Sequence, residues 1–208
     1  ALSWMSGYFI NQMFTPLIFY YQGAMSAGQI GVCLALMNML GLFAITWITV
    51  RSPQMGHLAA RNENLILERV FYKAFYQSIG IFSLGGFGIC ILLYLLRGHA
   101  IMTRFLSEQE IVILLCAYFF VHMIGALSLY LRAHKKELFT PLSIIGAVLQ
   151  ALFAWYGAFY YGTVGVCWSI LIVNAFYGFP SACWLWVKFR NTRRDEKGKE
   201  SDVFEAYH

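Results

Sequence analysis

Residues 2–22 form an apolar run that carries several neutral polar side chains able to bind a ligand by hydrogen bonds. At 100° per residue, these groups fall within a sector of about 60° of a helix. They are an indole, a phenol, an amide and a hydroxyl, from Trp4, Tyr8, Asn11 and Thr15, with Gln12 on the flank. Because lipid offers no hydrogen bonds, such a stripe is expected to line a watery substrate path or to bind a partner helix. Hydrogen bonding between helices, worth roughly 0.5–2 kcal/mol per bond, is the simpler alternative.

Two further residues of the apolar runs are candidates for this path. Asn38 stands in the middle of the second run, residues 30–50, and is predicted to line the same cavity. Pro16 predicts a kink in the first helix. Small residues spaced by four in and just before the second run predict close helix packing. They are Ala27, Gly31 and Ala35.

The sequence offers no set of residues that points to catalysis, a cofactor or a metal. The histidines outside the tail fall in separate loops or inside an apolar run, so they are not expected to converge on one metal. They are His57, His99, His122 and His134. Every carboxylate lies in a loop, at a span edge or in the tail, which leaves no intramembrane acid. We therefore expect a protein that is not an enzyme, unless a site lies at its cytoplasmic surface.

The composition identifies the class of protein. Of its 208 residues, 60% are hydrophobic and 12% are charged, and the mean hydropathy is +0.61. These values lie outside the usual range of soluble domains. Apolar runs that reach the roughly 20 residues needed to cross a bilayer occur at 2–22, 30–50, 70–96, 111–131, 141–161 and 164–187. We expect an all-α, polytopic integral membrane protein, with one six-helix bundle over residues 1–188 and a flexible charged tail over 189–208.

Local signals predict where several of these helices begin and how their buried polar groups are satisfied. Ser26 with Gln29, and Ser107 with Glu110, have the spacing of a capping box. Proline is predicted at the first helical position after Ser52 and after Thr140. The isolated polar residues of the later runs are predicted to be hydrogen-bonded within the bundle. They are His122, Gln150 and Asn174.

The basic residues predict an orientation. If six runs span the membrane, 13 of the 15 Lys and Arg residues lie on one side, and only Arg97 and Arg104 lie on the other. The positive-inside rule then makes the 51–69 loop, the 132–138 loop and both termini cytoplasmic. The first of these loops carries Arg51, Pro53, Arg61 and Arg69. The net charge of +5 is spread over short blocks, so no nucleic-acid partner is predicted.

Several short motifs, in order, resemble one transporter family. A G-x-x-x-x-G-Q-I-G entry at 23–31 precedes the second run, which leads into Pro53 and a charged stretch at 61–73. A Y-L-R-A-H-K-K turn follows at 130–136, and a G-T-V-G turn at 162–165 precedes the last run. This pattern resembles Wzx-type oligosaccharide flippases, the polysaccharide biosynthesis branch of the MOP exporter superfamily, which is related to MATE transporters. The resemblance covers residues 1–188 and only the C-terminal half of the family's architecture.

The resemblance implies a fold and a function. Members have twelve or more helices in two bundles around a central cavity, so this chain would supply one bundle and need an N-terminal six-helix bundle or a second copy as partner. It would move a polyprenyl-diphosphate-linked oligosaccharide across the bacterial inner membrane, for surface polysaccharide assembly of the O-antigen or capsule type. Lipid-linked oligosaccharide and the bilayer would be its other partners. The first charge of the chain is Arg51, so cationic contacts would have to come from the other half.

Two other functions stay open at this point. One is half of a MATE-like exporter of small molecules, which the lack of intramembrane carboxylates disfavours. The other is a membrane scaffold subunit that does not transport, with the polar stripe bound to a partner helix. The chain begins at Ala1 instead of Met, which is expected of a fragment or a processed product.

Overall fold

The described part of the chain is helical throughout. The computed structural model describes residues 2–61, 63–133, 140–189 and 191, and these ranges contain no strand. The elements are α1 (Leu2–Gln22), α2 (Ala24–Thr49), α3 (Ser52–Ala60), α4 (Asn64–Leu95), the 3-10 helix η1 (Ala100–Arg104), α5 (Glu108–Ala133), α6 (Thr140–Ile172) and the π-helix η2 (Val173–Gly178). Helical backbone continues over residues 179–189.

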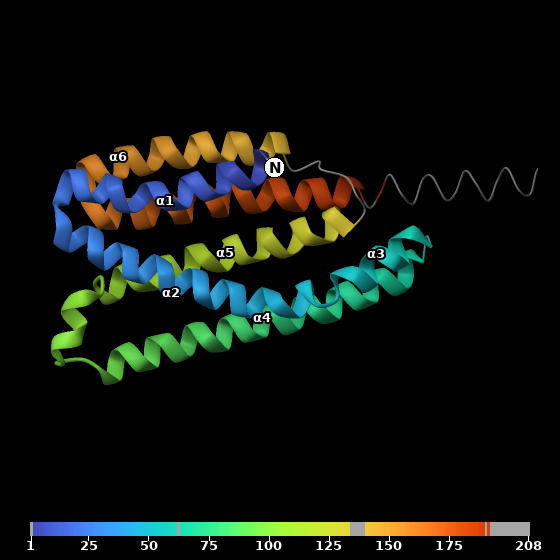
Figure 1. Cartoon of the computed structure of the whole chain (residues 1–208), viewed down its shortest axis with the longest axis horizontal. Helices are drawn as coiled ribbons and strands as arrows, with labels where there is room; N and C mark the ends of the chain where they lie inside the picture. Colours follow the sequence, from blue (N-terminus) through green and yellow to red (C-terminus); the bar gives the residue numbers. More distant parts are fainter. Residues whose placement is uncertain (1, 62, 134–139, 190, 192–208) are drawn as a thin grey trace, which may run out of the picture.

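The long helices lie side by side as one elongated bundle (Figure 1). α1 packs on α2 and α6, α2 also packs on α4 and α5, and α5 packs on α6. We call the end of the bundle that carries α3 the α3 end, and the end with the turns at Gly23 and Gly162 the Gly23 end. Apolar side chains fill the centre, among them Ile18, Ile30 and Leu114, which are fully buried.

Four described segments are long and apolar enough to cross a membrane. They are Ala24–Ala60, Leu65–Leu95, Glu108–Arg132 and Leu142–Phe189. The predicted class, an all-α membrane protein, is therefore supported, whereas the predicted count of six spans is not confirmed. The second span also begins earlier than the predicted residue 30. Gly23, with φ of 84°, makes the turn between α1 and α2 by itself, because glycine tolerates this left-handed backbone.

The last of these segments folds back on itself at Gly162. The backbone there has φ of 63° and ψ of −135°, which no helix contains. Figure 1 shows the chain reversing at this point. We call residues 140–161 the first arm and residues 163–189 the second arm. Gln22, at the end of α1, accepts a hydrogen bond on Oε1 from the Thr163 backbone N–H at 3.3 Å and so satisfies the start of the second arm.

The predicted connection over residues 51–69 is mostly helical, and it contains the helix start predicted at Ser52 and Pro53. Pro53 lies in the first turn of α3, where its missing N–H costs no helical bond, as predicted. The Met55 side chain is fully buried at the α3 end, in one cluster with Phe71 and Tyr130. Only residues 61–63 separate α3 from α4. Burial of this apolar face explains why a polar stretch folds against the bundle.

One predicted capping box is confirmed and the other is wrong. Glu110 Oε2 accepts from the Ser107 N–H at 2.9 Å, and Ser107 Oγ accepts from the Glu110 N–H at 3.4 Å, which starts α5. By contrast, Ser26 lies inside α2, whose N-cap residue is Gly23. The Gln29 side chain instead donates to the Thr103 carbonyl at 2.9 Å and ties α2 to η1.

An ion pair crosses the connection between α4 and α5 at the Gly23 end. The Arg97 guanidinium forms a two-pronged hydrogen bond with the Glu108 carboxylate. This bond raises the pKa of Arg97 above its usual value. Both side chains are exposed, so we expect the pair to contribute little to stability.

Candidate functional site: an uncharged cavity between the two arms

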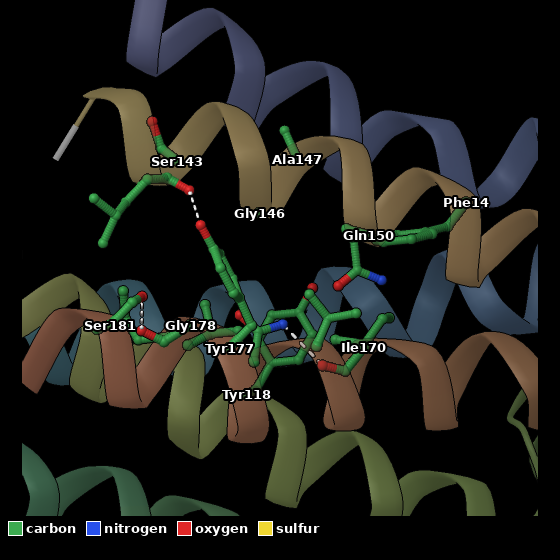
Figure 2. Close-up of a pocket in the computed structure, with 15 residues that line it drawn as sticks. Phe14, Tyr118, Ser143, Gly146, Ala147, Gln150, Ile170, Tyr177, Gly178 and Ser181 are labelled. Atoms are coloured by element: carbon green, nitrogen blue, oxygen red, sulfur yellow. Dashed lines mark hydrogen bonds between the residues drawn. The ribbon is translucent and has the colours of Figure 1, made fainter.

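A cavity of about 210 Å³ lies between the two arms of the hairpin, with α5 and α1 closing its sides. Figure 2 shows this space, bordered by the first arm on one side and the second arm on the other. Apolar residues supply most of its wall, including Phe14 from α1. The polar residues at its wall are Tyr118, Ser143, Gln150, Asn174, Tyr177 and Ser181. None of the described residues that line it is charged.

A π-helix forms the floor of the cavity. η2 supplies four lining residues, Val173, Asn174, Tyr177 and Gly178. Pro180 is the second residue after η2, and a proline ring in a helix collides with the carbonyl four residues earlier, which here is that of Phe176. A widened turn at this place relieves that collision, and π-helical segments are frequent at functional sites.

The Gln150 side chain is buried at the wall and held in place. Only 5% of the residue is exposed. Its Nε2 donates to Ser169 Oγ at 3.4 Å, and Ser169 Oγ donates in turn to the Val166 carbonyl at 2.7 Å. The Asn174 amide likewise donates to the Ile170 carbonyl at 2.8 Å. The prediction that Gln150 and Asn174 are hydrogen-bonded within the bundle is confirmed, but both also line the cavity.

Tyr177 joins the two arms across the cavity. Its hydroxyl donates to the Leu142 carbonyl, in the first turn of the first arm, at 3.2 Å. Its ring lies against Gly146, where a Cβ atom would be 3.2 Å from Cε1. The glycine therefore makes room for the ring, and the hydroxyl bond holds the α3 end of the hairpin closed (Figure 2).

Replacing Tyr177 with phenylalanine is expected to loosen this closure. Tyr177→Phe keeps the ring and removes one hydrogen bond, worth about 1 kcal/mol of the free energy of unfolding. We expect faster hydrogen exchange of the backbone amides near the start of the first arm. Tyr156→Phe is the control, because Tyr156 is exposed on the first arm and does not line the cavity. Equal exchange in the two variants would contradict the closure.

The polar stripe predicted on α1 is only partly within the described side chains. The side chains of Trp4, Tyr8 and Asn11 lie outside the described part of the structure. Gln12 is exposed. Thr15 faces α2, since a Cβ atom added at Gly31 would lie 3.6 Å from Thr15 Oγ1. Thr15 therefore sits at a contact between α1 and α2.

Asn38 does not line the cavity but lies next to a residue that does. Its side chain is exposed on α2 and lies near the Tyr118 hydroxyl of α5, a residue that lines the cavity. Pro16 is exposed within α1, which is continuous through it, and the kink stays a prediction. Sequence reasoning missed Phe14, the α1 residue that does line the cavity.

The predicted cytoplasmic residues lie at the α3 end and do not line the cavity. Arg51 donates to Gln77 Oε1 at 2.8 Å and so joins the start of α3 to α4. Arg61 follows the last residue of α3, and Arg69 lies in α4. Both side chains are exposed. These residues are placed to meet solvent or lipid headgroups.

A second buried polar contact joins three helices away from the cavity. His122 of α5 and Ser78 of α4 are 2.9 Å apart, Nε2 to Oγ, and Ser78 also donates to the Ala44 carbonyl of α2 at 2.7 Å. The prediction that His122 is hydrogen-bonded within the bundle is confirmed. Within the described ranges, no group of three or more His, Cys, Asp or Glu side chains could hold a metal ion.

Comparison of the chain with protein-family models, with curated proteins and with solved structures found no match. The function must therefore be argued from the cavity and its surroundings. One sequence signal could have located the cavity: Asn174 and Tyr177 stand three residues apart just before Pro180, inside an apolar run. Polar residues beside a proline inside a helix are a signal of a widened helical turn.

Proposed function

We propose that this chain is one helical bundle of a membrane transporter that flips polyprenyl-diphosphate-linked oligosaccharide units across the bacterial inner membrane. The observation that carries the proposal is the uncharged cavity between the arms, whose mostly apolar wall carries six polar residues, inside a bundle of membrane-length helices. Polar groups are costly within a membrane, and those that persist there commonly mark a substrate path. The resemblance of the short motifs to Wzx-type flippases supplies the cargo and the bacterial membrane.

The chemistry of the cavity favours this cargo over a small cation. A cation exporter needs a buried carboxylate to hold its substrate. The one buried carboxylate among the described residues is Glu110, and it caps α5 outside the cavity. Amides and hydroxyls match the uncharged, hydroxyl-rich part of an oligosaccharide. The MATE-like alternative is therefore the weaker one.

The proposed topology places the α3 end in the cytoplasm. Six spans, made by α1, α2, α4, α5 and the two arms, put 13 of the 15 basic residues on that side. Both termini are then cytoplasmic. The predicted 189–208 tail lies almost wholly outside the described residues.

Transport by this bundle requires a second one. A single bundle opens a path to both leaflets only by moving against a partner, either an N-terminal six-helix bundle or a second copy. The exposed Asn38 lies on the face of α2 that we assign to this partner side. Asn38 would then contact cargo in the space between the bundles and, through Tyr118, the wall of the cavity.

The experiment that tests the proposal measures flipping in proteoliposomes that hold the chain in its native assembly. A fluorescent polyprenyl-diphosphate oligosaccharide is followed by its exposure to an added glycosidase. Asn38→Leu removes one hydrogen-bonding side chain, so we expect flipping to slow by about 2- to 10-fold. Met39→Leu is the control, because Met39 is the exposed apolar neighbour. Flipping no faster than in protein-free liposomes would refute the proposed function.

A further inference from the structure

We propose that the cavity between the arms binds one uncharged sugar ring through Gln150, Asn174 and Tyr177, and that it excludes the diphosphate. The inference deepens the proposed function, on which it rests for the source of the sugar. It assigns a part of the cargo to a place within this bundle, separate from the space between two bundles.

The absence of charge at the wall decides which part of the cargo fits. A diphosphate carries negative charges that a buried site must pair with Lys, Arg or a metal ion. None of the described lining residues carries a charge, and α1 and α2, the helices nearest the proposed partner, have no Lys, Arg, Asp, Glu or His. A buried diphosphate here would stay uncompensated, so the ligand must be neutral.

The polar groups that are present suit a polyol. An amide both donates and accepts hydrogen bonds, and each hydroxyl of a sugar does the same. Gln150 points into the space from the first arm and Tyr177 from the second, so that a ring between them meets polar groups on two sides (Figure 2). The aromatic rings of Phe14, Tyr118 and Tyr177 offer apolar surface for the C–H faces of a pyranose.

The size of the cavity suits one ring. Its volume of about 210 Å³ equals that of about seven water molecules at roughly 30 Å³ each. Pockets for drug-sized ligands run from about 300 to 1,000 Å³, so this space holds one hexose-sized ring and leaves further sugars of a chain outside it.

The test is saturation-transfer NMR on the chain in lipid nanodiscs without glycoside detergent, with methyl β-D-glucopyranoside as the neutral probe and its uronate as the charged one. Magnetisation should pass from protein methyl groups to the neutral probe and not to the uronate. Ala147→Leu fills the cavity, and Gln150→Leu removes the buried amide at similar volume. We expect each variant to lower the transfer at least fivefold. Ala151→Leu, the same change one turn further along the first arm and outside the lining, should leave it unchanged.

The outcomes separate this inference from the proposed function. Three results would overturn the cavity as a sugar site. They are transfer to the neutral probe that is as strong in Ala147→Leu as in the unchanged chain, transfer to the uronate as strong as to the neutral probe, and no transfer to the neutral probe. The flipping assay is independent of these readings. A chain that binds the neutral probe in the cavity but moves no lipid-linked cargo would refute only the proposed function, and a chain that flips cargo without any sugar contact in the cavity would refute only the inference.

Discussion

Replacing Gly157 with alanine is expected to separate the two arms of the hairpin and to lower the free energy of unfolding by about 3 kcal/mol, the upper end of the usual cost of overpacking. A Cβ atom at Gly157 would lie 2.5 Å from the Gly165 carbonyl oxygen. The obstacle is backbone, so no side chain can turn away to relieve it. The same close approach of small residues lets helices pack tightly in a membrane, where lipid tails are as apolar as the side chains.

The measurement is a denaturant titration of the protein in one detergent, followed by tryptophan fluorescence. Gly80→Ala in α4 is the matched control, because a Cβ atom there meets nothing within 4 Å. The control should be unchanged or up to about 1 kcal/mol more stable, since alanine is the better helix former. Because both arms line the cavity, Gly157→Ala should also abolish binding of the neutral sugar. If Gly157→Ala were as stable as the control, the contact between the arms would be wrong.

Replacing Ser78 with alanine is expected to lower the free energy of unfolding by about 2 kcal/mol, because it leaves a buried hydrogen-bond donor without an acceptor. The single hydroxyl proton of Ser78 is donated to the Ala44 carbonyl, so the contact with His122 requires His122 Nε2 to carry the donated proton. Ser78 is fully buried and His122 is 4% exposed, with its ring stacked on Phe82 at 5.0 Å between centroids. Without Ser78, that N–H loses its partner where water does not reach.

A double variant separates this cause from simple loss of packing. Ser78→Ala with His122→Leu removes both polar partners, so the pair should recover part of the stability that Ser78→Ala alone loses. Ser83→Ala is the control, because Ser83 is exposed on the same helix. Thermal unfolding in a single detergent compares the variants. A double variant no more stable than Ser78→Ala would contradict the hydrogen bond as the cause.

Local signals predicted the parts of the fold that depend on neighbours in sequence. The apolar runs predicted the membrane-length helices, because a bilayer requires a long stretch of apolar residues whatever else the chain does. Ser107 and Glu110 predicted the start of α5, since a capping box closes within four residues. The predicted turn at 162–165 coincides with the reversal at Gly162, whose backbone only glycine adopts readily.

One local signal failed because another glycine and a tertiary contact were stronger. Ser26 and Gln29 have capping-box spacing, but Gly23 turns the chain earlier, and the Gln29 side chain donates to the Thr103 carbonyl instead. Thr103 lies far away in sequence, so the spacing of Ser26 and Gln29 could not reveal this contact.

The amino-acid sequence is sufficient to predict an apolar, helical protein with its charges in the connections and near the ends of the long helices, because bilayer length, helical period and capping act over a few turns of chain. The folded structure is needed to show which faces meet: Thr15 lies against Gly31, and Gln150 and Tyr177 share a cavity. Periodicity places residues on one face of a helix but does not name the helix opposite. The cavity lies between the Gly157–Gly165 contact at one end of the hairpin and the Tyr177–Leu142 hydrogen bond at the other, beside the π-helix, and that combination exists only once the hairpin has closed.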